Sequence, residues 1–108
     1  MKFGRFEPWA EYHEDGEYYE FHCLNGYGAT VARGQHDELF ELDVIKRNRL
    51  YPSYWDITFD TPITSDVLEN LEVDDVVKAL EDISRLADDY DLLRESFVDH
   101  DGNVVFVD

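Results

Sequence analysis

The chain has 108 residues, the size of one domain, and its 26 acidic and 9 basic residues give a formal net charge of −17. This charge argues against direct binding to DNA, RNA or an anionic membrane, because such partners need surfaces of Lys and Arg. Hydrophobic residues make up 44% and aromatic residues 15%, too many for a disordered acidic tail, so we expect residues 1–108 to form a single acidic domain.

Alternating apolar residues and turn signals predict five strands in the first 59 residues. Asp15-Gly16 is typical of a hairpin turn, and Asn25–Gly28 predicts a second turn. The fourth strand has a uniformly apolar face at Phe40, Leu42 and Val44, which we expect to point into the core. The predicted strands cover residues 3–13 (with a break near Pro8), 17–24, 29–33, 38–46 and 54–59.

After residue 60 the hydrophobic period changes from 2 to 3.6, which predicts helix. Ser65 suits the N-cap of a short helix over residues 66–71, and a main helix is expected to begin at Val73 or Asp74, with its continuation to Arg94 left open. Its apolar stripe comprises Val73, Val76, Val77, Leu80, Ile83, Ala87 and Tyr90.

The predicted fold class is therefore α+β. We expect a curved antiparallel sheet of five to six strands, packed on one face by one main C-terminal helix. A final β-hairpin is expected around Asp101-Gly102.

The acidic residues are concentrated in the second part of the chain, with a net charge of −5 over residues 1–59 and −12 over residues 60–108. In the main helix they occur as pairs seven residues apart, which is about 10.5 Å of rise and about 20° of rotation. The pairs are Asp74-Asp75, Glu81-Asp82 and Asp88-Asp89. They predict two neighbouring acidic columns on the side away from the apolar stripe, without compensating Lys at i+4.

These columns suggest that the protein mimics nucleic acid. A basic groove that holds phosphates would also attract such a helix face, although duplex DNA carries a charge about every 1.7 Å and the pairs are sparser. Flanking acids and tyrosines would have to contribute. The residues expected to contact the partner are Asp66, Glu69, Asp74, Asp75, Glu81, Asp82, Asp88, Asp89, Tyr90 and Tyr54. The alternative interpretation is an ordinary solvated helix face.

Aromatic residues offer a second means of contact. Seven are more than one small core needs: Tyr12, Tyr18, Tyr19, Tyr27, Tyr51, Tyr54 and Trp55. Tyr and Trp are favoured anchors in protein interfaces, so an acidic rim with aromatic anchors suits a basic protein partner. The alternative is that about half of these rings simply cover the sheet.

No pattern indicates an enzyme, a cofactor or a metal. Cys23 is the only cysteine, which excludes an internal disulfide and a Cys-based zinc site and suggests a buried thiol, with the adjacent His22 on the opposite strand face. The four histidines share no metal-ligand spacing. The segment 99–103 lacks the glycine position and the final Glu of a calcium loop, so we expect a turn there.

Three segments resemble a family of small uncharacterised proteins from bacteriophages and prophages. They are Asn25–Arg33 (Asn-Gly-Tyr-Gly-Ala-Thr-Val-Ala-Arg), Glu38–Leu42 (Glu-Leu-Phe-Glu-Leu) and Asp60–Val67 (Asp-Thr-Pro-Ile-Thr-Ser-Asp-Val), and the likeness covers about residues 20–86. The resemblance implies a viral origin and carries over no functional residues. By analogy with small acidic phage proteins, it implies an anti-defence role, such as an anti-CRISPR or anti-restriction protein.

We therefore expect a non-enzymatic inhibitor in the host cytoplasm that binds a nucleic-acid-binding defence protein, a CRISPR effector or restriction enzyme, through its basic groove. No membrane association is expected, and a homodimer is left open. Three alternatives remain: an acidic domain adapted to high salt, a general protein-interaction module without mimicry, and a small metal-dependent enzyme.

Overall fold

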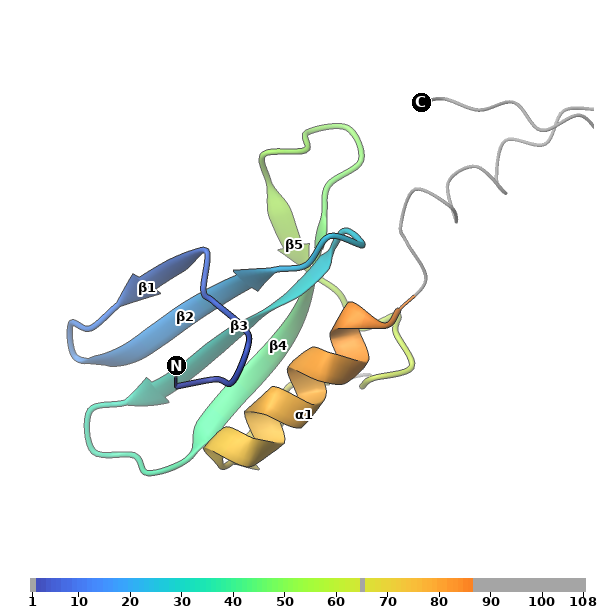
Figure 1. Ribbon diagram of the computed structural model, residues 1–108. Helices are drawn as coiled ribbons and strands as arrows, with labels where there is room; N and C mark the ends of the chain where they lie inside the picture. The colour runs from blue at the N-terminus through green and yellow to red at the C-terminus, as the bar shows by residue number, and fades with distance from the viewer. Residues whose placement is uncertain (1, 65, 87–108) are drawn as a thin grey trace, which may run out of the picture.

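The computed structural model describes residues 2–64 and 66–86, and it is an α+β fold in which one α-helix packs on a six-stranded antiparallel sheet (Figure 1). Within the described residues, the helix α1 follows the six strands. The elements in chain order are β1 (Ala10–Tyr12), β2 (Gly16–His22), β3 (Tyr27–Gly34), β4 (Phe40–Arg47), β5 (Trp55–Ile57), β6 (Leu68–Leu71) and α1 (Val73–Ser84).

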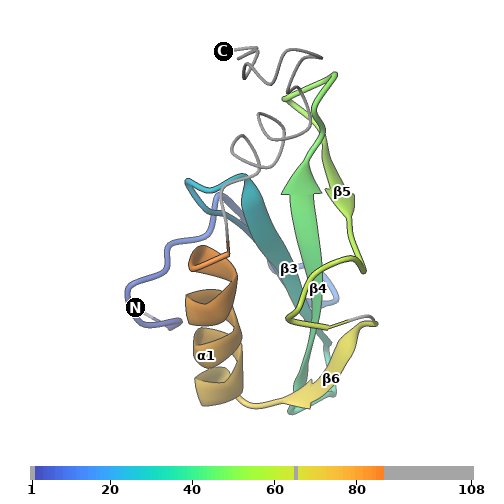
Figure 2. The same cartoon turned by 90° about the vertical axis from the view of Figure 1, so that its right-hand side faces the viewer.

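The strands β1 to β5 pair in chain order, so each meets the next through a short connection. The β1–β2 turn contains Asp15 with a φ of 54° and Gly16 with a φ of 129°, which confirms the predicted turn. The last strand, β6, pairs with β4 on the same edge as β5, and Figure 2 shows the two strands one above the other along β4.

The core lies between α1 and one face of the sheet, which we call the inner face. Phe40, Leu42 and Val44 are buried there, as the alternation in β4 predicted. The remaining core residues are Phe3, Phe6, Tyr19, Phe21, Tyr27, Ala29, Val31, Val76, Ala79, Leu80 and Ile83. The apolar stripe of α1 is therefore confirmed for Val76, Leu80 and Ile83.

The N-terminal segment corrects one prediction, because residues 3–9 form no strand. A turn brings Phe3 and Phe6 into the core, with the Phe6 N–H donating to the Phe3 carbonyl at 3.1 Å. The Phe3 ring makes edge-to-face contacts with Tyr19, Phe21 and Phe40 at centroid distances of 4.9, 5.5 and 5.7 Å. The aromatic spacing that predicted a strand therefore reflects burial of rings from a turn.

Residues 66–71 correct a second prediction, because they contain strand β6 rather than a short helix. The register pairs Phe40 with Leu71 and Leu42 with Leu68, across an irregularity that leaves Asn70 at a φ of 58°. Pairing satisfies backbone groups of β4 that would otherwise form an open edge, and this tertiary gain outweighs a local helical pattern.

The main helix begins at Val73, as predicted, and ends at Ser84, short of Arg94. The predicted cap Ser65, the stripe residues Ala87 and Tyr90, and the final hairpin lie outside the described residues. In the ranges that the structure covers, no helix is long and apolar enough to span a bilayer.

Candidate protein-interaction surface

The acidic side of α1 is only partly available to a partner. Asp74 and Asp82 are exposed, and no Lys or Arg in the described part of the chain pairs with either. Asp75 instead closes the start of the helix, where its Oδ2 accepts the Glu72 backbone N–H at 3.0 Å. A carboxylate in the first turn of a helix also interacts favourably with the helix dipole, so Asp75 has a structural role.

Glu81 has a structural role as well. Arg5 donates to it from Nε to Oε1 at 3.0 Å and from Nη2 to Oε2 at 2.9 Å, which ties the N-terminal turn to α1. The hydrogen bonds from Arg5 hold the pKa of Glu81 below its usual value. Arg85 approaches the same carboxylate at 3.7 Å from position i+4.

These contacts correct the expectation of an uncompensated helix. Arg5 and Arg85 both bind the Glu81 carboxylate, whereas Lys78, which stands at i+4 from Asp74, forms no ion pair with that residue. The acidic columns are therefore interrupted by positive charge and are less like a row of phosphates than the sequence pattern suggested.

The remaining predicted contact residues are not brought together. Asp66 and Glu69 are exposed, but they lie just before and within β6 rather than on α1. Tyr54 is 65% exposed in the β4–β5 loop, which lies at the opposite end of the sheet from the first turn of α1 (Figures 1 and 2). Asp88, Asp89 and Tyr90 lie outside the described residues.

Positive charge in the described ranges is concentrated on two carboxylates. Glu17 on β2 binds the side chains of Lys2 and Arg33 and accepts the Tyr19 hydroxyl hydrogen at 2.6 Å. Burial by itself raises the pKa of Glu17, but the hydrogen bonds from Lys2, Tyr19 and Arg33 outweigh it and lower the pKa to about 2. Together, Glu17 and Glu81 engage four of the eight Lys and Arg side chains in residues 2–64 and 66–86.

Many other acids therefore have no cationic partner in the part of the chain that the structure describes. The described ranges contain 19 acidic and 8 basic residues, a net charge of −11. The unpaired, exposed carboxylates include Asp66, Glu69, Asp74 and Asp82, all of which are predicted contact residues. A large part of the surface keeps a strongly negative potential as a result.

The sheet face opposite α1, here called the outer face, carries a row of aromatic side chains. In Figure 2, α1 lies on one side of the sheet, and no other described element covers the opposite side. His22 is the middle of a stack, with its ring centroid 4.5 Å from that of Trp9 and 3.9 Å from that of Trp55. The stack spans β3 and β4, where the register places Gly28 and Ile45, so it explains why Ile45 is only 2% exposed.

Gly28 also has a specific role in this stack. A Cβ at Gly28 would lie 1.9 Å from the Phe21 carbonyl oxygen, so no larger residue fits without a shift of the backbone. Because Gly28 lies between the strands that carry His22 and Trp55, its missing side chain also leaves room above the sheet for the two rings.

Glu20 connects this stack to a second aromatic pair. Its Oε2 lies 2.6 Å from His22 Nε2, and its Oε1 accepts the Tyr18 hydroxyl hydrogen at 3.0 Å. Burial and this carboxylate raise the pKa of Tyr18 to about 12, so the phenol stays protonated as the donor. Tyr12 lies beside Tyr18 with ring centroids 5.8 Å apart.

The sequence indicated an excess of aromatic residues, but it did not predict the stack around His22 or the Tyr12–Tyr18 pair. Tyr19 and Tyr27 are buried, whereas Tyr12, Tyr51 and Tyr54 are more than 60% exposed. Trp9, which is not among the seven aromatic residues expected at an interface, is 67% exposed. The alternating positions 18, 20 and 22 of β2 are the signal that places these side chains on one face.

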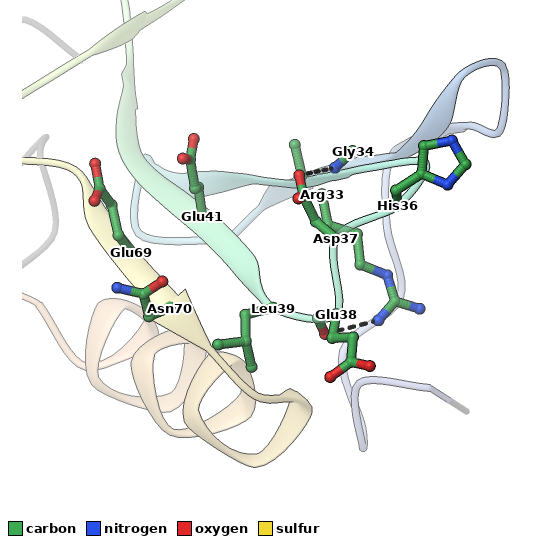
Figure 3. A pocket seen from close by; sticks show the side chains of 10 residues that line it. Arg33, Gly34, His36, Asp37, Glu38, Leu39, Glu41, Glu69 and Asn70 are labelled. Carbon is green, nitrogen blue, oxygen red and sulfur yellow. Dashed lines mark hydrogen bonds between the residues drawn. The ribbon is translucent and has the colours of Figure 1, made fainter.

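A pocket of about 500 Å³ opens at the end of the sheet where the β3–β4 loop meets β6 (Figure 3). Its wall includes Ala32, Glu41, Glu69 and Asn70, and Figure 3 shows the carboxylates of Glu41 and Glu69 projecting in the same direction from β4 and β6. Arg33 closes one side by donating from Nη1 to the Glu38 carbonyl at 3.1 Å.

The described residues contain no cluster of three or more His, Cys, Asp or Glu side chains suited to a metal. Burial raises the pKa of the Cys23 thiol, and Cys23 packs against the core while His22 stacks on the outer face. This geometry separates the thiol from the nearest imidazole in sequence and supports the expectation of a structural cysteine.

Comparison with known proteins finds no matching family model, no similar curated protein and no similar solved structure. Function is therefore inferred from the surfaces described above.

Proposed function

We propose that this protein is a non-enzymatic inhibitor that binds a basic, nucleic-acid-binding protein and competes with nucleic acid for its cationic groove. The observation that carries the proposal is that the ion pairs of Lys and Arg described above neutralise only a few of the acidic side chains. Four basic side chains neutralise only Glu17 and Glu81, which leaves exposed carboxylates such as Asp74, Asp82 and Glu69 to act on a partner.

Electrostatics supports this mode of action. Within a Debye length, about 8 Å at physiological salt, the exposed carboxylates attract a positive surface and repel nucleic acid. Steering of this kind raises association rates roughly 10- to 1000-fold at low salt. Given the resemblance of residues 20–86 to phage proteins, we propose a host defence protein as the partner.

The direct test uses the full-length chain to capture proteins from a nuclease-treated bacterial lysate at about 50 mM and about 500 mM NaCl, since exposed charges are screened at the higher salt. The expected result is a basic nucleic-acid-binding protein that is released by salt and displaced by added duplex DNA. The variant to compare neutralises four exposed acids that have no cationic partner among the described residues, two before or within β6 and two on α1: Asp66→Asn, Glu69→Gln, Asp74→Asn and Asp82→Asn.

A matched control neutralises four exposed acids elsewhere: Glu7→Gln, Glu14→Gln, Asp15→Asn and Asp60→Asn. Both variants lose the same formal charge, so a site-specific interface predicts at least tenfold weaker capture only for the first. Equal capture by both variants, or a captured protein that duplex DNA does not displace, would contradict the proposal.

A further inference from the structure

The outer face has a strip of small side chains on β3 between larger side chains on β2 and β4. On β3 its side chains are small, with Gly28, Thr30 and Ala32 along the strand. Tyr18, Glu20 and His22 flank this strip on β2, and the flanking positions on β4 are Glu41, Asp43 and Ile45. The strip leads along β3 toward the pocket, whose wall includes Ala32 and Gly34. The His22–Trp55 stack covers the Gly28 end, so the open part runs from Thr30 to Gly34 and spans about 14 Å at about 3.4 Å per residue, the length of about four extended residues.

The rings beside this strip are held in place before any partner binds. His22 is fixed by two stacked tryptophans and by Glu20, and Tyr18 donates to the same carboxylate. Fixed aromatic side chains lose little conformational entropy on binding, which makes them effective anchors. One face of Trp9 packs on His22, yet the residue is 67% exposed, so its other face is available for contact.

The charge of the face indicates the kind of partner. In the described ranges, no Lys or Arg pairs with Glu41 or Asp43 on β4, or with Glu69 on the neighbouring β6. Arg suits a face that carries both an exposed tryptophan ring and unpaired carboxylates, because one guanidinium can stack on the Trp9 ring while another pairs with a carboxylate on β4. Apolar contact remains available at Ile57, which is 54% exposed.

We propose that the outer face binds an extended, Arg-containing segment of a partner protein along β3, anchored on Trp9 and Tyr12 and paired with Glu41 and Asp43. The inference rests on the proposed function only in taking the partner to be basic. It differs in the surface that it assigns, since the outer face lies on the side of the sheet away from α1 (Figure 2).

Charge disfavours two other occupants of this face. A second copy of the chain would bring a net charge of −17 against exposed carboxylates. Residues 87–108 of the same chain carry seven acidic residues and a single Arg, so they meet the same repulsion.

The test is an NMR titration of the full-length, isotope-labelled chain with a nine-residue peptide of alternating Arg and Gly, and with its Lys counterpart. We expect shifts of the Trp9 and Trp55 indole signals and of the amide signals of outer-face residues on β2–β4. We also expect the Arg peptide to bind more tightly than the Lys peptide. The double variant Trp9→Ala, Tyr12→Ala should bind at least tenfold more weakly. The control Tyr51→Ala, Tyr54→Ala removes two equally exposed rings from the β4–β5 loop and should bind as the unaltered chain does.

Shifts centred on α1, or equal affinities of the two double variants, would overturn the proposal. So would self-association through the outer face, or contacts between Trp9 and residues beyond 86 in the free chain. Thermal unfolding of each variant verifies that it is folded.

The two proposals fail in different ways. If Trp9→Ala, Tyr12→Ala still captures a protein that duplex DNA displaces, the outer-face proposal is wrong and the competitor function stands. If the peptide binds the outer face but no captured protein is displaced by DNA, the competitor function is wrong and the docking surface stands.

Discussion

Among the carboxylates that the structure describes, Glu17 has the largest expected effect on stability. It receives hydrogen bonds from Lys2, Tyr19 and Arg33, and its pKa is lowered from 4.5 to about 2. A lowered pKa in the folded state means that the stabilisation is complete above about pH 4.5 and is lost as the pH falls toward 2. We predict that Glu17→Gln lowers the free energy of unfolding by about 2 kcal/mol at pH 7, allowing for solvent screening.

Urea unfolding at pH 7, 5 and 3.5 measures this effect. The difference in free energy of unfolding between the unaltered chain and Glu17→Gln should be smallest at the lowest pH. Glu14→Gln is the control, since Glu14 is exposed. A gap that stays constant or widens as the pH falls would show that Glu17 is not held ionised by its partners.

Asn70 lies in β6, the strand that the sequence did not predict, and a substitution there tests whether the strand forms. Its φ of 58° is a left-handed conformation that Asn and Gly tolerate and that β-branched residues do not. We predict that Asn70→Val destabilises the fold by about 1–2 kcal/mol, whereas Asn70→Gly changes it by less than about 0.5 kcal/mol. Urea unfolding of both variants is the measurement. If residues 66–71 were helical instead, Gly would be the worse substitution.

At the scale of the element, some acidic residues of α1 stabilise the helix itself, whereas others are available to contact a partner. Asp75 accepts the Glu72 N–H in the first turn, whereas Asp82 is exposed in the last turn. We predict that Asp75→Asn lowers stability by about 0.5–1 kcal/mol, because it removes a charged cap at the positive end of the helix dipole. Asp82→Asn should change stability by less than about 0.5 kcal/mol, because a negative charge near the C-terminal end is unfavourable.

Thermal unfolding of the two single variants provides the comparison, because both make the same chemical change on the same helix. Equal losses of stability would mean that Asp75 does not cap α1. The pair also guides binding experiments, since Asp82→Asn probes a partner without weakening the helix.

At the scale of the whole molecule, the net charge of −17 is expected to cost stability through self-repulsion. The core between α1 and the sheet, which has 14 buried residues in the described ranges, should nevertheless keep the chain folded at low salt. We predict a folded protein in dilute buffer whose Tm rises by about 5–10 °C between about 20 mM and about 500 mM NaCl, as screening removes roughly 1–2 kcal/mol of repulsion.

Circular dichroism melts across this salt series distinguish the prediction from adaptation to high salt. A salt-adapted domain would unfold below about molar salt, where its charges are unscreened. Unfolding in dilute buffer would therefore favour that alternative over a binding role for the acids.

Local patterns were sufficient for much of the fold. The turn at Asp15-Gly16, the buried alternation of Phe40, Leu42 and Val44, and the start of α1 at Val73 follow from interactions between residues close in sequence. The charge imbalance is likewise a property of composition. The sequence by itself thus determined an acidic α+β domain with a helix on an antiparallel sheet.

Only the tertiary structure decided how these parts are used. Pairing with the edge of β4 turned residues 68–71 into a strand, and burial of Phe3 and Phe6 replaced the first part of the predicted first strand, residues 3–9, by a turn and loop, while residues 10–12 form β1. Arg5 reaches Glu81 across 76 positions, and His22 meets Trp9 and Trp55 from different strands. Such contacts depend on which segments are adjacent in space, a property that no local period encodes.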